Sequence, residues 1–168
     1  ALPKDIEWHF IGHLQTNKVK YIAPFVSLIQ SVDSERLLDE IQKQAAKIGR
    51  VIDVLLEVHI AQEKSKSGFD PEALIDLLSD VNIGHRWPNV NLKGIMAMAT
   101  FTDDETQIRS EFRRLMSYYR QLLEGPLAQQ GITAEQFAIR SFGMSEDFKI
   151  AIDEGSNMVR IGSHIFGE

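Results

Sequence analysis

The sequence has no cysteine among its 168 residues, so neither disulfides nor thiolate chemistry can contribute to its fold or function. This composition permits a cytoplasmic setting, and we expect a cytoplasmic protein. Apolar runs are short, the longest being 54–56 and 95–99, and no signal peptide is recognisable. A bilayer-spanning helix needs roughly 20 apolar residues. We therefore expect no membrane partner.

Basic residues and familiar catalytic motifs are also scarce. The 18 Lys and Arg are outnumbered by 24 Asp and Glu, giving a net charge of -6, which disfavours a nucleic-acid partner. The sequence lacks a Walker loop and a Gly-x-Ser-x-Gly elbow. No pair of histidines has reliable helical metal-ligand spacing, so we predict no metal site. The sequence begins at Ala1, and we expect a trimmed or incompletely represented chain.

What the sequence does contain is a regular alternation of β-rich runs and amphipathic helical segments. The predicted strands cover residues 7–12, 25–32, 51–60, 92–99, 136–142 and 157–161. Helices are predicted over 34–48, from Asp70-Pro71 to Val81, and over 104–124. A short helix after Ser145 ends before Gly155, and its spacing predicts that Phe148, Ala151 and Ile152 face inward.

Six strand-helix units over residues 1–168 predict one domain, either a doubly wound sheet or part of a (β/α)8 barrel. A complete barrel usually needs roughly 250 residues. A dinucleotide-binding fold would want a glycine-rich loop after the first strand, and Phe10-Ile11-Gly12-His13 is not one. Barrels commonly bind phosphate in the loops after their last two strands. We therefore predict an incomplete barrel that binds a phosphorylated ligand.

The two candidate phosphate-binding junctions are Gly143-Met144-Ser145 and Ile161-Gly162-Ser163. Ser145 is expected either to cap a helix or to hold phosphate oxygens. Gly162 and Ser163 form either a simple turn or a close backbone approach to a ligand. Arg160 lies in an apolar strand, where it pairs either with a carboxylate such as Glu57 or with a ligand. His9 and His59 are candidates to line a pocket or to be buried in the core.

Four motifs resemble the pyridoxal phosphate homeostasis proteins, which are single-domain relatives of the alanine racemase barrel. These motifs are WHFIGHLQTNK from Trp8, KSGF from Lys66, GIMAMA from Gly94, and the final run from Gly143 to Gly167. The resemblance implies a pyridoxal 5'-phosphate (PLP) site. It implies that Ser145, Gly162 and Ser163 hold the phosphate and that Arg160 faces the pyridine nitrogen. Met144 and His9 are the further expected cofactor-binding residues.

The sequence departs from this family in several places. The family's Schiff-base lysine lies on the first barrel strand, and the pattern here begins at what would be the third. No lysine in the sequence matches it, so covalent cofactor attachment is unsupported and no catalytic residue is assigned. His59, Arg140 and Asn157 also replace the usual family residues, through divergence or engineering.

The resemblance implies a PLP-binding protein of vitamin B6 homeostasis that carries the cofactor rather than catalysing turnover. One alternative is a racemase-like PLP enzyme, which would need the lysine and a second base. The other is a truncated or engineered barrel scaffold without activity. Open sheet edges would favour self-association in any of these cases.

Overall fold

The computed structural model describes residues 3, 5–63, 67–80 and 82–167. Within these ranges, six strands form one sheet, with every adjacent pair parallel and in chain order. They are β1 (Trp8–Phe10), β2 (Val26–Val32), β3 (Ile52–Glu57), β4 (Val90–Met96), β5 (Ile139–Met144) and β6 (Met158–Arg160). The six predicted strands are confirmed in number and order. Their ends differ: Ala97 and Ala99 remain buried after β4 ends, so apolar character continues beyond the strand.

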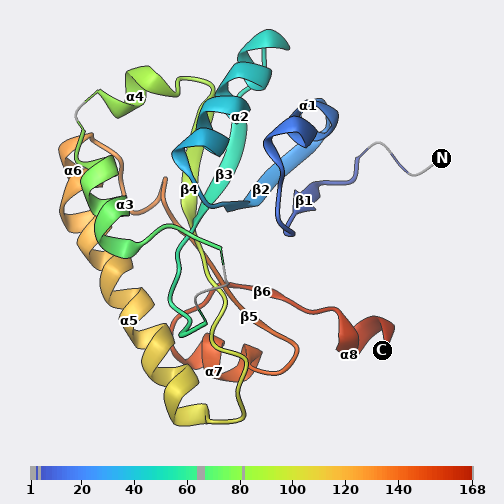
Figure 1. The fold of residues 1–168 in the computed structure, drawn as a ribbon, viewed down its shortest axis with the longest axis vertical. Coiled ribbons are helices and arrows are strands. Elements are labelled where there is room, and N and C mark those ends of the chain that lie inside the picture. Colours follow the sequence, from blue (N-terminus) through green and yellow to red (C-terminus); the bar gives the residue numbers. More distant parts are fainter. Residues whose placement is uncertain (1–2, 4, 64–66, 81, 168) are drawn as a thin grey trace.

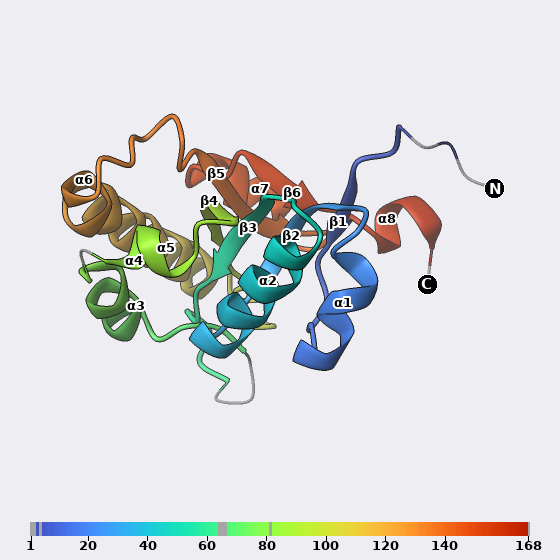
Figure 2. The same cartoon turned by 90° about the horizontal axis from the view of Figure 1, so that it is seen from above.

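The helices lie outside the curled sheet (Figures 1 and 2). They are α1 (Val19–Ile22), α2 (Glu35–Lys47), α3 (Pro71–Leu78), α4 (Ile83–Arg86), α5 (Glu105–Glu124), α6 (Pro126–Gln129), α7 (Phe148–Asp153) and α8 (Ser163–Phe166), with a 3-10 turn, η1 (Thr16–Lys18). A curled parallel sheet with helices on its outer face is the architecture of an incomplete (β/α)8 barrel. The predicted fold class is confirmed.

Side-chain oxygens cap the starts of the three longer helices, as was predicted for Asp70. The Ser34 hydroxyl accepts from the backbone of Leu37 at the start of α2. Asp70 caps α3, which has proline at its first position, and Asp104 caps α5. All the residues predicted to line the inner face of α5 are buried: Ile108, Phe112, Leu115, Tyr119 and Leu122. Val81, predicted to end the α3 stripe, lies outside the described residues.

Two helix predictions were wrong. Ile48 follows the end of α2 and is 42% exposed, because the amphipathic stripe ends one turn earlier at Ala45. The short helix α7 starts only at Phe148, with Asp147 at its cap position, so Ser145 is not a helix cap. This later start changes which side chains face the sheet. Ile150 and Ala151 are buried, whereas Ile152 is 52% exposed.

Apolar side chains pack on both faces of the sheet. The larger cluster lies between strands and helices and includes Ile29, Val54 and Phe142. The smaller cluster consists of Leu28, Leu55 and Met96, with Met98 and Met158 packed against it. Because side chains alternate along a strand, this second cluster marks the inner face of the curled sheet. Met96 and Met98 therefore pack inside the curled sheet.

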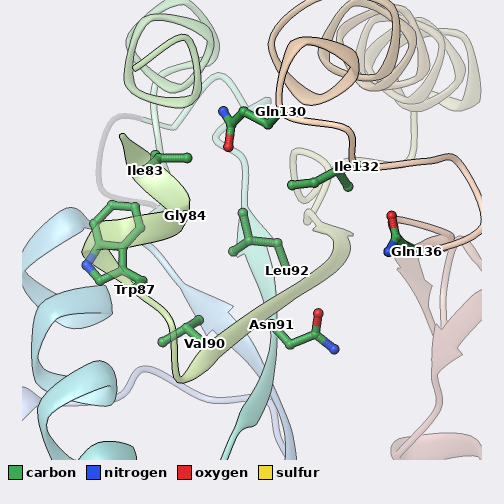
Figure 3. A pocket seen from close by; sticks show the side chains of 9 residues that line it. All are labelled: Ile83, Gly84, Trp87, Val90, Asn91, Leu92, Gln130, Ile132 and Gln136. Atoms are coloured by element: carbon green, nitrogen blue, oxygen red, sulfur yellow. The ribbon is translucent and has the colours of Figure 1, made fainter. Parts of the chain in front are cut away.

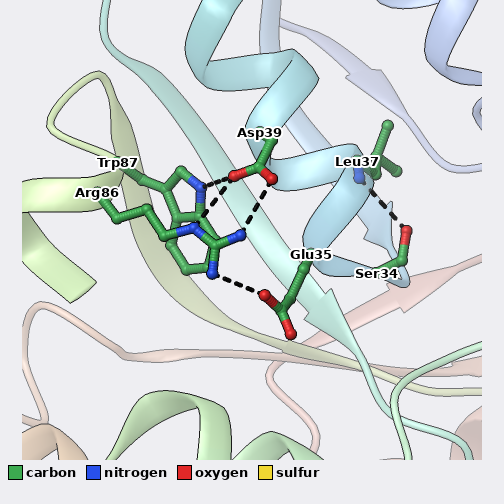
Figure 4. Close-up of polar contacts among 6 residues, drawn as sticks. All are labelled: Ser34, Glu35, Leu37, Asp39, Arg86 and Trp87. Carbon is green, nitrogen blue, oxygen red and sulfur yellow. Dashed lines mark hydrogen bonds and ion pairs between the residues drawn. The ribbon is translucent and has the colours of Figure 1, made fainter. Parts of the chain in front are cut away.

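A polar contact joins α2 to the end of α4 (Figure 4). Arg86 donates to Glu35 at 2.6 Å and to Asp39 at 3.0 Å, and the Trp87 indole donates to Asp39 at 2.7 Å. Burial acts to raise the pKa of Asp39, but the hydrogen bonds from Trp87 and Arg86 outweigh it and lower that pKa. This contact joins the first turns of α2 to the segment that precedes β4.

Candidate functional site

The two predicted phosphate-binding junctions meet at the carboxyl ends of β5 and β6. The backbone N–H of Gly162 lies 3.4 Å from the Ser145 hydroxyl, and Ser145 is only 8% exposed. Gly162 occupies the cap position of α8, and Ser163 is its first residue. A Cβ added at Gly162 would meet no atom within 4 Å, so open space adjoins its backbone. The structure thus brings Ser145, Gly162 and Ser163 together.

Met144 and Asp147 form the rim of this junction. The backbone N–H of Met144 donates to the Asp147 carboxylate at 2.7 Å, and the Met144 side chain is 39% exposed. The Asp147 carboxylate therefore faces the backbone of the turn to which Asp147 belongs. Met144 occupies the position where a ligand's apolar surface could lie against the mouth of the sheet.

Arg160 lies inside the sheet beside this junction. Its Nη1 group donates to the carbonyl and hydroxyl oxygens of Ser141 at 2.9 and 2.8 Å, and its Nη2 group donates to the carbonyl of Ala97 at 3.0 Å. Among the described residues these oxygens, and not the Glu57 carboxylate, are its hydrogen-bond partners. Burial lowers the pKa of Arg160, while the charges of Glu57 and Asp147 oppose that shift. A guanidinium nevertheless remains a cation in a protein.

A chain of polar side chains leads from Arg160 to His9 on the opposite edge strand. The Ser141 hydroxyl donates to the Gln30 amide oxygen at 2.6 Å, and the Gln30 amide nitrogen lies 3.2 Å from Nδ1 of His9. Sequence reasoning missed Gln30 and Ser141. Gln30 could have been found from the sequence, because it is a polar amide within a seven-residue buried strand. A buried polar group needs hydrogen-bond partners.

Glu57 is a second buried group that sequence reasoning placed only as a partner of Arg160. It ends β3 with 3% of its surface exposed, and the Ser67 hydroxyl donates to it at 2.8 Å. Burial raises the pKa of Glu57, the Ser67 hydrogen bond opposes this, and the nearby Asp33 charge adds to it. Ser67 belongs to the KSGF motif, whose Lys66 lies outside the described residues.

Two hollows lie elsewhere than the β5–β6 junction, and the larger one is lined in part by Ser67, the hydrogen-bond partner of Glu57. One of about 530 Å³, lined by polar residues that include His13, Asp33 and Arg36, opens beside the start of α2. A smaller one of about 130 Å³ lies at the start of β4 between Trp87, Leu92 and Ile132 (Figure 3). Neither is lined by Ser145 or Arg160.

The described part of the chain contains no group of three or more His, Asp or Glu residues that could hold a metal ion. In the same residues, no helix has both the length and the apolar character required to cross a bilayer.

Comparison with known proteins assigns the family. Residues 5–168 match the family described as alanine racemase, N-terminal domain. The chain belongs to this family. It is 42% identical over 164 residues to the pyridoxal phosphate homeostasis protein of Aquifex aeolicus, covering 98% of this chain and 68% of that protein. It is 35% identical to the protein of that name from Pasteurella multocida, covering 96% of this chain and 66% of the other.

Solved structures agree with the fold. PipY of Synechococcus elongatus, with PLP bound, has 26% identity and a TM-score of 0.81, covering 99% of this chain and 72% of that one. A protein of unknown function from Bifidobacterium adolescentis has 39% identity and a TM-score of 0.82, covering 96% and 61%. The chain therefore spans about two thirds of the length of its relatives.

Two of the predicted departures from the family pattern contact each other. The Asn157 side chain accepts from the backbone of Arg140 at 2.7 Å and donates to Ala138 at 2.9 Å. The Arg140 guanidinium donates to Gly155 and lies 5.5 Å from the centre of the Tyr119 ring. Arg140 and Asn157 lie near the amino ends of β5 and β6, whereas the candidate site lies at the carboxyl ends of these strands. Arg140 and Asn157 therefore contact each other, and none of these contacts involves Ser145, Arg160 or Gly162.

His59, the third departure, lies just beyond the end of β3. Its backbone N–H donates to Phe69 at 2.9 Å, while Nδ1 of its ring is buried with no hydrogen-bond partner among the described residues. Nδ1 of His59 is thus an unsatisfied polar atom at the same end of the sheet as the candidate site.

Proposed function

We propose that residues 1–168 form a domain that binds pyridoxal 5'-phosphate in the cytoplasm and serves vitamin B6 homeostasis by holding or carrying the cofactor. The observation that carries this proposal is the convergence of the Ser145 hydroxyl and the Gly162 N–H beside the partly buried Arg160. A PLP-bound relative with the same fold supports the choice of ligand.

The donor set of the site suits the two ends of this cofactor. Ser145, Gly162 and Ser163 offer hydroxyl and backbone N–H donors to a phosphate. Arg160 would face the pyridine nitrogen, while Met144 and His9 would lie against the ring. When bound, PLP supplies an aldehyde and an electron-withdrawing ring. Because a guanidinium keeps its protons, Arg160 would hold the ring nitrogen without protonating it. This favours binding over turnover.

Cofactor retention is expected to be non-covalent in this chain. No lysine of the motifs matches the Schiff-base lysine of the family: Lys18 lies in η1, and Lys93 lies in β4 immediately before the GIMAMA motif. Borohydride reduction of the PLP-saturated chain followed by peptide mass spectrometry checks this expectation. A single stoichiometrically modified lysine would contradict it.

Replacement of the phosphate-binding hydroxyl tests the proposal. Ser145→Ala should weaken PLP binding by about tenfold, because one hydrogen bond to a charged group contributes about 1.5 kcal/mol. Fluorescence titration with PLP measures the change. Ser117→Ala, which removes an exposed hydroxyl from α5, is the matched control and should bind like the wild type. Equal affinities for wild type and Ser145→Ala would reject the assigned phosphate site.

A further inference from the structure

His9 and Arg160 lie on the two outer strands of the sheet, yet a continuous series of side-chain hydrogen bonds connects them. Arg160 contacts Ser141, Ser141 contacts Gln30, and Gln30 contacts His9, at 2.8, 2.6 and 3.2 Å. Ser141 is completely buried and Gln30 is 2% exposed. Their polar atoms must therefore find partners within the protein.

The donor at each step follows from the chemistry of Arg160. A guanidinium has N–H groups and no acceptor, so the Ser141 oxygen must accept from it. The hydroxyl hydrogen of the buried Ser141 then needs another acceptor, and the Gln30 oxygen at 2.6 Å is in place. This fixes the orientation of the Gln30 amide. Its NH₂ group is directed at Nδ1 of His9 and, at 3.4 Å, at the sulfur of Met158.

We propose that Gln30 is a positioning residue that, through Ser141, couples Arg160 to His9 and holds the His9 ring in the tautomer protonated at Nε2. Because Nδ1 accepts from Gln30, it carries no hydrogen. The exposed ring edge of His9 consequently offers a donor and not an acceptor. Two residues expected at the cofactor site are thereby fixed by one relay inside the sheet.

Gln30→Glu reverses the last step while preserving the others. The carboxylate keeps an oxygen for the Ser141 hydroxyl but replaces the NH₂ group with an acceptor facing His9. The ring should then move its proton to Nδ1 or become doubly protonated. Gln129→Glu makes the same chemical change at an exposed position of α6 and is the matched control.

Long-range ¹H–¹⁵N spectra of the ring nitrogens, recorded without PLP at a pH where free histidine is neutral, measure the tautomer directly. The His9→Gln variant identifies the His9 signals by their loss. We expect an Nε2–H pattern in wild type and Gln129→Glu, and protonated Nδ1 in Gln30→Glu. A wild-type ring protonated at Nδ1, or an unchanged pattern in Gln30→Glu, would overturn the proposal.

A second variant keeps the test decisive if Gln30→Glu does not fold. Ser141→Ala removes an acceptor from Nη1 of Arg160, so the guanidinium should rotate faster and its separate Nη proton signals should merge. Unchanged Arg160 signals would count against the relay.

The effect on the cofactor rests on the proposed function: Gln30→Glu should weaken PLP binding about tenfold. The spectra contain no PLP, so the two claims fail separately. A wild type with the predicted tautomer but no affinity for PLP would leave the relay standing and remove the function.

Discussion

At the scale of single residues, the sheet buries an ionisable side chain, Glu57. Glu57 places a carboxyl group next to Leu55 and Met96 at the end of an apolar strand, with Ser67 as its hydrogen-bond donor. The Arg160 charge partly compensates it, but burial has the larger effect and the pKa of Glu57 is raised above 4.5. The ionised form of this residue therefore destabilises the folded state.

Glu57→Gln should stabilise the protein at pH 7. The folded state binds the Glu57 proton more tightly than the unfolded chain does, so this residue's contribution to stability is lost as pH rises from 4.5 through the raised pKa. Urea unfolding at pH 7 and pH 4 should show a difference between the two proteins that shrinks toward pH 4. The exposed Glu72→Gln is the control. A difference that grows on acidification would refute this assignment.

At the scale of elements, the contact between β4 and β5 depends on one glycine. Gly94 has φ +154°, and a Cβ there would lie 1.8 Å from the Ile139 carbonyl oxygen. This oxygen belongs to the backbone of the neighbouring strand and cannot move aside without separating the pair. The requirement explains the glycine that begins the GIMAMA motif.

Gly94→Ala should cost more than about 4 kcal/mol of unfolding free energy, within the range reserved for severe substitutions. In Gly84→Ala, an added Cβ in α4 meets open space, and we expect a change of less than about 1 kcal/mol. Thermal and urea unfolding compare the two variants. Near-native stability of Gly94→Ala would show that the strand pairing is wrong.

How far the sequence predicts this structure also depends on scale. The Asp70 cap and the periodic burial along α5 are local signals and were read correctly. The cap of α7 was misplaced because Ser145 bonds across the sheet to Gly162, a partner that local pattern does not reveal. The contact of Gln30 with Ser141, 111 positions apart, arises only when the sheet curls.

At the scale of the whole molecule, β1 and β6 are the outermost strands of the described sheet, and they do not pair with each other. Outer strands present unpaired backbone groups that can pair with another chain. Figures 1 and 2 show β1 and α8 on the same side of the molecule. The exposed Trp8 on β1 adds apolar surface to that edge, with 41% of it accessible.

We expect this chain to self-associate with increasing concentration. Trp8→Lys should weaken association, because edge lysines oppose strand pairing. Sedimentation velocity over a hundredfold range of concentration is the measurement. Ile48→Lys alters an equally exposed apolar residue away from both outer strands and should not change the association. A monomer at every concentration would contradict the open-edge interpretation.

The central claim, that the β5–β6 junction holds the phosphate of PLP, is tested most directly by equilibrium dialysis of the wild-type chain against PLP and against pyridoxal. The two ligands share the ring and the aldehyde and differ only in the phosphate. The account predicts PLP binding at least about tenfold tighter, since several charge-assisted hydrogen bonds depend on that group. Equal dissociation constants for the two ligands would contradict it.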